Sequence, residues 1–254
     1  MTNTTEKKIT GVLYGVGVGP GDADLLTIKA VKILQSCDII AAHAPLLENG
    51  NDDSVPSMAM SIATPHIPEN VQKYIMRIPM QVARFPAQDV YDKITDDLKT
   101  HLDAGKNIAV LCEGDPFFYG SFMYLFARLS PLYQCEIVPG VSSLMAGASM
   151  AKIALAARND SLVILPAPMD EDKFIQQLEQ ANAAVIIKLG RHFKRIAKIL
   201  CDKGYGDKAH YISHATMPQQ KIMPLIKAYE GGVVAPYFSM IVLHHDGVAW
   251  GDIL

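Results

Sequence analysis

The sequence predicts an α/β protein made of two domains, and three observations lead to this prediction. Apolar runs of strand length alternate with stretches in which apolar residues recur at helical spacing. Several of the predicted strands end in glycine-containing loops that lead into a helix, as in parallel sheets. The chain has 254 residues, a length that suits one large domain or two small ones, and half of them are hydrophobic, which is ample for a packed core.

The first predicted domain, residues 1–154, begins with an apolar strand over 12–16 and a glycine loop. After this loop Asp22 is placed to cap a helix, and Gly105 is placed to end a later one. The next expected elements are a strand over 38–42, a proline-rich irregular stretch over 45–86 with one short helix and a strand near 74–78, and a helix over 90–104. They are followed by a buried strand over 107–112, a helix over 121–129, a strand over 135–138 and a helix over 144–151.

The second predicted domain, residues 155–254, continues the alternation without a low-complexity linker before it. Its strands are expected over 161–165, 183–189, 210–214 and 240–244, and its helices over 173–180 and 193–201. A cleft between two such α/β halves is a common place for a ligand.

Charge and composition argue against several classes of protein. The net charge of −3 and the isoelectric point near 6.2 disfavour a nucleic-acid binder, which needs a basic surface. No apolar run reaches the roughly 18 residues that a membrane span needs, and the polar residues 1–10 do not resemble a signal peptide. The cysteines stand singly and fit neither a zinc site nor a disulfide framework, so we expect reduced thiols in a cytoplasmic protein: Cys37, Cys112, Cys135 and Cys201.

Three predicted strands of the first domain end in loops that contain glycine, over 15–22, 113–116 and 139–143. The carboxyl ends of parallel strands lie at one edge of a sheet, so the three loops are expected to converge there. Glycine suits a backbone that approaches a ligand closely or adopts a positive φ. A tight turn between strand and helix explains any one of these loops equally well. The convergence of all three predicts a site for a small cofactor.

The first loop departs from the glycine pattern of dinucleotide sites. It reads Gly15-Val-Gly-Val-Gly-Pro-Gly-Asp22, and Pro20 stands where that pattern has glycine. Proline has no N–H group to bind phosphate, and the Asp22 carboxylate would repel a pyrophosphate. The loop therefore favours a nucleoside with a charged but unphosphorylated tail.

Three motifs resemble those of the tetrapyrrole methylase family, which comprises S-adenosylmethionine-dependent methyltransferases of cobalamin and sirohaem biosynthesis. They are Val16-Gly-Val-Gly-Pro-Gly-Asp22 with Leu25-Leu-Thr27, then Glu113-Gly-Asp-Pro116, then Val138-Pro-Gly-Val-Ser-Ser143. Their order and spacing match, and the resemblance covers nearly the whole chain. Within the family, the segments 113–122, 215–218 and 235–240 resemble the branch that methylates precorrin-2 at carbon 20.

The resemblance implies two α/β domains with S-adenosyl-L-methionine in the cleft between them, precorrin-2 as substrate, precorrin-3A as product, and a homodimer. Carried over by position, the cofactor-binding residues of the first half are Pro20, Gly21, Glu113, Gly114, Asp115, Phe118, Ser142 and Ser143. In the second half, Leu189 and Ala215 fall where the family meets the adenine.

Methyl transfer from a sulfonium is an in-line displacement that needs no metal, and the protein mainly aligns the donor with the acceptor. The acceptor carbon must then lose a proton, so Glu113, Asp115 and Tyr119 are candidate bases. Structural explanations stay open beside these roles. Asp115 before proline can initiate a turn, and Ser142 and Ser143 can cap a helix. The aromatic residues over 117–126 are expected to lie mostly in the core, and Tyr119 is the one most readily assigned to the cleft.

Other polar residues are weaker candidates for metal or carboxylate binding. His244 and His245 should point to opposite faces of a strand and so do not readily share an ion. The substrate's carboxylates need basic partners, although an exposed arginine is more often an ordinary surface residue. The candidate partners are Arg77, Arg84, Arg158 and Arg191.

Three alternatives stay open. The acceptor can be metal-free precorrin-2 or the cobalt-loaded equivalent of the anaerobic route, and the longer motifs favour the metal-free substrate. A nicotinamide-dependent oxidoreductase fits the glycine loop, but Pro20 and the lack of a ribose-binding acid after the second strand argue against it. A methylase fold that binds its cofactor without catalysis is disfavoured by the three intact motifs.

Overall fold

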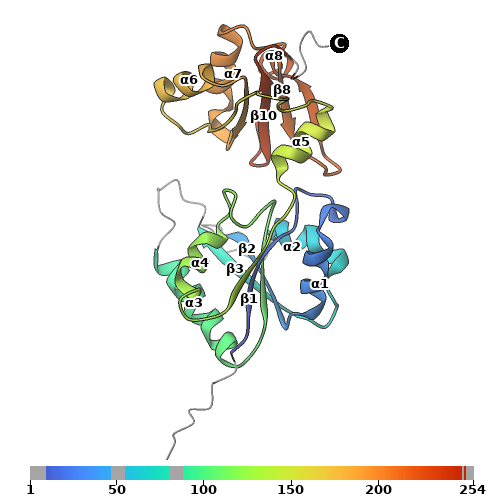
Figure 1. Cartoon of the computed structure of the whole chain (residues 1–254), viewed down its shortest axis with the longest axis vertical. Helices are drawn as coiled ribbons and strands as arrows, with labels where there is room; N and C mark the ends of the chain where they lie inside the picture. Colours follow the sequence, from blue (N-terminus) through green and yellow to red (C-terminus); the bar gives the residue numbers. More distant parts are fainter. Residues whose placement is uncertain (1–9, 47–54, 80–87, 248, 250–254) are drawn as a thin grey trace, which may run out of the picture. The chain divides into compact units, whose positions relative to one another are not determined.

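The computed structural model describes residues 10–46, 55–79, 88–247 and 249. The chain divides into two compact units, Met1–Ser142 and Ser143–Leu254, each with its own sheet (Figure 1). The sequence places the boundary after residue 154, whereas this division assigns the helix over 143–151 to the second unit. Leu144 of that helix packs with strand residues of the second unit, which explains the assignment.

The first unit is a parallel sheet with helices on both faces. Its strands run in the order β3-β2-β4-β1-β5, and each neighbouring pair is parallel. The strands are β1 (Leu13–Gly17), β2 (Ile39–Leu46), β3 (Gln72–Pro79), β4 (Ile108–Cys112) and β5 (Cys135–Val138). The helices are η1 (Ala23–Leu25), α1 (Ile28–Ser36), α2 (Met58–Ala63), η3 (Thr64–His66), α3 (Gln88–Asp103) and α4 (Phe122–Leu129), where η marks a 3₁₀ helix. Helices α1 and α2 lie on one side of the sheet, and α3 and α4 lie on the other (Figure 1).

The second unit holds a mixed sheet in the order β6-β7-β10-β8-β9. Strands β6 and β7 pair in parallel, and the other described neighbours pair antiparallel. The strands are β6 (Leu162–Pro166), β7 (Ala183–Ile187), β8 (Ala209–Ser213), β9 (Lys221–Pro224) and β10 (Ser239–His244). The helices are α5 (Ser143–Ala151), α6 (Glu171–Glu179), η4 (Gly190–His192), α7 (Phe193–Asp202) and α8 (Leu225–Glu230). Because β10 runs antiparallel to both β7 and β8, these two strands end at the same edge of the sheet.

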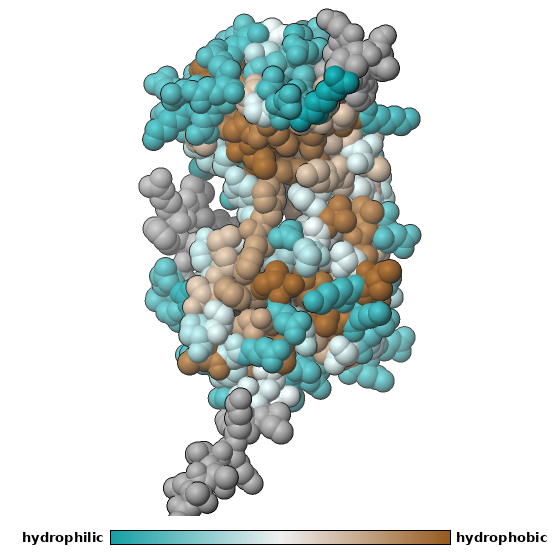
Figure 2. All heavy atoms as spheres, viewed as in Figure 1, coloured by the Kyte–Doolittle hydropathy of each residue, from teal (hydrophilic) through white to brown (hydrophobic). Residues whose placement is uncertain are grey.

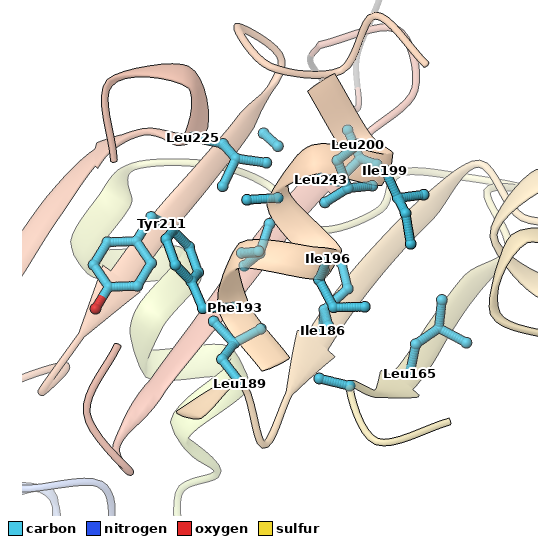
Figure 3. Packing of buried hydrophobic residues seen from close by; sticks show 14 of the residues in the cluster. Leu165, Ile186, Leu189, Phe193, Ile196, Ile199, Leu200, Tyr211, Leu225 and Leu243 are labelled. Carbon is cyan, nitrogen blue, oxygen red and sulfur yellow. The ribbon is translucent and has the colours of Figure 1, made fainter. Parts of the chain in front are cut away.

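The core of the second unit lies on both faces of its sheet. On one face α6, α7 and α8 pack against the strands through a large apolar cluster that includes Phe193, Leu200 and Tyr211 (Figure 3). On the other face α5 contributes Leu144 to a smaller cluster with strand residues. Hydrophilic residues cover the outer surface of α6 and α7 in Figure 2, so these helices are amphipathic and need the sheet to bury their apolar sides. None of the described helices is long and apolar enough to cross a membrane.

The predicted strands and helices of both halves are present, with differences in local detail. Asp22 does not cap α1: its carboxylate accepts a hydrogen bond from the Asp24 N–H at 2.9 Å and caps η1, while Thr27 caps α1. Strand β9 and helix α8 are not predicted from the sequence, because four and six residues are too few to show a period.

Candidate functional site

The carboxyl edge of the first sheet has a topological switch point between its neighbouring strands β1 and β4. From β1 the chain crosses to β2 on one side, and from β4 it crosses to β5 on the other. The loops 15–22 and 113–116 follow these two strands. Since open α/β sheets bind their ligands at such points, this edge is the candidate site.

The three glycine loops meet at this edge, as the sequence predicts. Gly19 and Gly114 form an isolated antiparallel bridge, in which the Gly114 N–H donates to the Gly19 carbonyl oxygen at 2.8 Å. A Cβ atom at Gly17 would lie 2.6 Å from the Gly114 carbonyl oxygen and 2.6 Å from the Gly140 Cα. A Cβ atom at Gly140 would lie 2.0 Å from the same oxygen. Glycine is therefore required at 17 and 140 because the loop backbones touch one another, a reason that differs from the expected approach to a ligand.

The end of the first loop is shaped by Pro20, Gly21 and Asp22. Pro20 is buried, Gly21 is half-buried, and Asp22 is exposed. The Asp22 carboxylate accepts a hydrogen bond from the Asp24 N–H at 2.9 Å. It therefore stands where a phosphate oxygen would have to lie to accept the same hydrogen bond. This geometry agrees with the expected preference for a ligand without phosphate.

Glu113 follows β4, and its side chain ties the second loop to α2. Its Oε1 atom accepts a hydrogen bond from the Ala59 N–H at 3.1 Å, near the start of α2. Desolvation by the surrounding protein raises the pKa of Glu113, while hydrogen bonds from the N–H groups of Glu113 itself and Ala59 oppose the rise. The residue as a whole stays exposed to solvent. The Glu113 carboxyl group is thus held by a hydrogen bond at the carboxyl edge of the sheet, on a residue whose other atoms are exposed.

Both carboxylate oxygens of Asp115 accept hydrogen bonds from backbone N–H groups. Oδ1 accepts from Phe117 at 2.9 Å, which is the turn expected for aspartate before proline. Oδ2 accepts from Gly140 at 3.1 Å, across 25 residues of sequence. Asp115 therefore shapes its own loop and fastens it to the third loop.

The tip of the second loop exposes three aromatic side chains. Phe117, Phe118 and Tyr119 are 46%, 37% and 44% exposed, and the rings of Phe118 and Tyr119 meet edge to face at 5.1 Å. Tyr119 has a φ of 56°, a left-handed conformation that is uncommon for a residue with a Cβ atom. The expectation that the aromatic residues over 117–126 are mostly core is correct for the fully buried Phe122 and wrong for the exposed Phe117 and Tyr124. The exposure of Phe118 and Tyr119 leaves both accessible for the roles that the sequence predicts for them.

The other predicted cofactor residues lie at or beyond the unit boundary. Ser142 ends the first unit and Ser143 begins α5, and both are half-buried. Leu189 follows β7 and Ala215 follows β8, at the edge of the second sheet where both strands end. Leu189 is fully buried and Ala215 is 6% exposed.

His43 lies in the second half of β2 and belongs to no motif of the sequence. Its Nδ1 is 3.1 Å from the Ser121 Oγ, and Ser121 also forms a hydrogen bond with the side chain of Tyr91. Burial lowers the pKa of His43 to about 4, so its ring is neutral at physiological pH. The Nε2 atom is buried and has no hydrogen-bond partner among the described residues. The apolar residues 44–46 that follow His43 are the signal that would have extended the predicted strand over 38–42 to include it.

The adjacent histidines make separate contacts. His244 Nε2 lies 3.3 Å from Asp160 Oδ2, whereas the ring of His245 stacks on Tyr205 with centroids 4.8 Å apart. Within the described ranges, no three histidine, cysteine, aspartate or glutamate side chains gather in a way that could hold a metal ion.

The candidate arginines of the described residues are divided between the two units. Arg77 Nη1 donates to the carbonyl oxygens of Val55 at 2.8 Å and Pro45 at 3.4 Å. Arg158 and Arg191 are exposed residues of the second unit. Arg84 lies outside the described residues.

Comparison with known sequences agrees with the motifs. The precorrin-2 C(20)-methyltransferase of Sinorhizobium sp is 35% identical, covering 92% of this chain and 95% of that protein. The cobalt-precorrin-2 C(20)-methyltransferase of Salmonella typhimurium is 30% identical, covering 93% of this chain and 97% of that protein. The cobalamin biosynthesis protein CobIJ of Mycobacterium tuberculosis is 34% identical over 92% of this chain, but the chain spans about half of that longer protein, 46% of its length.

Solved structures share the fold. The cobalamin biosynthetic enzyme cobalt precorrin-4 methyltransferase, CbiF, matches with a TM-score of 0.69 at 22% identity, covering 92% of this chain and 94% of that chain. Uroporphyrin-III C-methyl transferase from Thermus thermophilus, complexed with S-adenyl homocysteine, matches with a TM-score of 0.64 at 20% identity, covering 92% of this chain and 98% of that chain. The family model of Tetrapyrrole (Corrin/Porphyrin) Methylases matches residues 12–227, so that fold, motifs and family model agree. The chain belongs to the tetrapyrrole methylase family.

Proposed function

We propose that this protein is an S-adenosylmethionine-dependent C-methyltransferase that methylates precorrin-2 at carbon 20, giving precorrin-3A in cobalamin biosynthesis. The observation that carries the proposal is the 35% identity to the Sinorhizobium precorrin-2 C(20)-methyltransferase, which extends over 92% of this chain and 95% of that enzyme. A coverage this complete leaves no large part of that enzyme without a counterpart here.

The carboxyl edge of the first sheet fits an S-adenosyl donor better than a phosphorylated nucleotide. Pro20 offers no N–H group, and the Asp24 N–H at the start of η1 already donates to the Asp22 carboxylate. The Glu113 carboxyl group, which lies at this edge and accepts the Ala59 N–H, suits a ligand with a positively charged sulfonium and amino group. The proposed donor-binding residues are Pro20, Gly21, Glu113, Gly114, Asp115, Phe118, Ser142 and Ser143 of the segment 20–143, with Leu189 and Ala215 of the second unit.

When bound, S-adenosylmethionine supplies an activated methyl group for in-line displacement by a carbon of the tetrapyrrole. The residues of the chain then hold the reactants and accept the proton that this carbon loses. Of the three candidate bases, Asp115 already accepts two backbone N–H groups. Glu113 is better placed for proton transfer, since its raised pKa moves it toward neutral pH, and Tyr119 is accessible at the loop tip.

A methylation assay tests the reaction and the substrate together. The protein is incubated with S-adenosylmethionine and, in parallel, with metal-free or cobalt-containing precorrin-2, and the products are weighed by mass spectrometry. We expect one added methyl group on the metal-free substrate. An added methyl group on the cobalt-containing substrate alone would assign the enzyme to the anaerobic route. The 30% identity to the Salmonella cobalt-precorrin-2 enzyme is the reason for including this substrate. No gain on either substrate refutes the proposed activity.

Binding and mass measurements test the proposed cofactor and assembly. Calorimetry is expected to detect S-adenosylhomocysteine binding and no NADH binding, and the reverse result would support an oxidoreductase. Light scattering is expected to give twice the mass of the chain, as for the proposed homodimer. Comparing Glu113→Gln, Asp115→Asn and Tyr119→Phe identifies the base, because a variant with full turnover loses that role.

A further inference from the structure

Three hydroxyl-bearing side chains gather in the second unit where β8 ends and β10 begins. Tyr211, Ser213 and Ser239 are 1%, 3% and 6% exposed. Ser213 and Ser239 are cross-strand partners in the register of β8 and β10, and Tyr211 lies two residues before Ser213 on the same face. The Tyr211 hydroxyl points away from the apolar side chains of Leu200 and Ile199 (Figure 3). Hydrogen bonding with the Ser213 and Ser239 side chains opposes the rise that burial causes in the Tyr211 pKa.

This hydroxyl cluster connects to the segments on either side of it. Ser239 Oγ donates to the Pro236 carbonyl oxygen at 2.6 Å, in the segment that leads into β10. The ring of Tyr211 meets the ring of Phe193 edge to face at 5.1 Å, at the start of α7. Ser213 is the last residue of β8. One tyrosine therefore supports the chain segments after β7, after β8 and before β10.

The same segments hold residues in conformations that they do not prefer. Lys188, His214 and Thr216 have φ values of 57°, 49° and 67°, in the left-handed region that favours glycine. Such conformations persist where the surrounding structure fixes them, and they concentrate at ligand sites. Leu189 directly follows Lys188, and Ala215 lies between the other two. The loops at both residues thus take their shape from their surroundings.

We propose that Tyr211 is a positioning residue for the adenosyl group of the donor. Through Ser213 and Ser239 it holds the loops at Leu189 and Ala215 in the shape that binds the donor. This inference rests on the proposed function, since it takes an S-adenosyl compound as the ligand. A loop held in its bound shape loses little freedom on binding, so removing the support lowers donor affinity and leaves the chemical step unchanged.

Calorimetry with S-adenosylhomocysteine on Tyr211→Phe tests the proposal, because phenylalanine keeps the ring contact with Phe193 and removes the hydroxyl. We expect the Kd to rise by about 3- to 10-fold, the effect of losing one buried hydrogen bond. The KM for S-adenosylmethionine should rise with it, while kcat at saturating donor stays within about twofold of wild type. The matched control is Tyr229→Phe, which makes the same change at a tyrosine that packs against the same core from α8 and should leave the Kd unchanged.

Two further measurements separate positioning from simple stabilisation. The double variant Tyr211→Phe, Ser239→Ala should have a Kd no higher than that of the weaker-binding single variant, because both changes remove the same interaction between the two side chains. A Tyr211→Phe protein that melts earlier but binds S-adenosylhomocysteine as wild type does would overturn the proposal. If Tyr211→Phe does not fold, Ser213→Ala and Ser239→Ala decide in its place. Wild-type protein that fails to bind S-adenosylhomocysteine would refute the proposed function instead.

Discussion

Replacing Gly140 with alanine is expected to disrupt the junction of the three loops. The new Cβ atom would lie 2.0 Å from the Gly114 carbonyl oxygen and 2.8 Å from the Gly17 Cα. Ordinary contact begins near 3.4 Å, so the backbones must separate by about 1.4 Å. Both neighbours are backbone atoms, which cannot rotate away as a side chain would. Overpacking of this kind costs about 1–3 kcal/mol, and the separation also strains the hydrogen bond from the Gly140 N–H to Asp115 Oδ2.

Thermal unfolding and calorimetry measure this effect. At about 2–4 °C per kcal/mol, the Tm should fall by about 2–12 °C, and S-adenosylhomocysteine binding should weaken in the folded variant. The matched control is Gly206→Ala in the second unit, where the closest neighbours of a new Cβ are side-chain atoms of Cys201 and Ile226 at 3.3 Å. It should lower the Tm far less. A Gly140→Ala protein with the Tm and affinity of wild type would show that the loops are not packed in this way.

Two further predictions concern Asp115 and His43. Asp115→Asn turns one acceptor oxygen into an NH₂ donor, so the N–H group of either Phe117 or Gly140 loses its partner. Denaturant unfolding should then show a free energy of unfolding lower by about 1–2 kcal/mol. A variant as stable as wild type contradicts the fastening role. Burial lowers the pKa of His43 to about 4, against about 6.5 in the unfolded chain. The unfolded chain therefore binds more protons between these values, and stability should fall as the pH drops through this window. Between about pH 4 and 7, the denaturant midpoint of His43→Gln should depend less on pH than that of wild type. If both depend equally on pH, a group other than His43 causes the loss of stability.

The alternation of strands and helices was predictable because it depends on local spacing of apolar residues, as in the buried β4. The meeting of the three loops was predictable as well, since parallel strands place their carboxyl ends at one edge. The exposure of Phe117 was not, because helical spacing indicates a core only where a helix exists, and this residue precedes α4. The antiparallel pairing of β10 in the second sheet was also beyond the local pattern, which does not specify strand direction.

The sequence by itself determined the two α/β halves, the loops that share an edge and the motifs of the tetrapyrrole methylase family. Each of these depends on residues that are close together along the chain. Only the tertiary structure decided what the glycines and the acidic residues of those loops do. Gly17 and Gly140 are glycine because the loop backbones touch each other, and Asp115 fastens the second loop to the third. These contacts join residues far apart in sequence, so packing sets them and no local pattern encodes them.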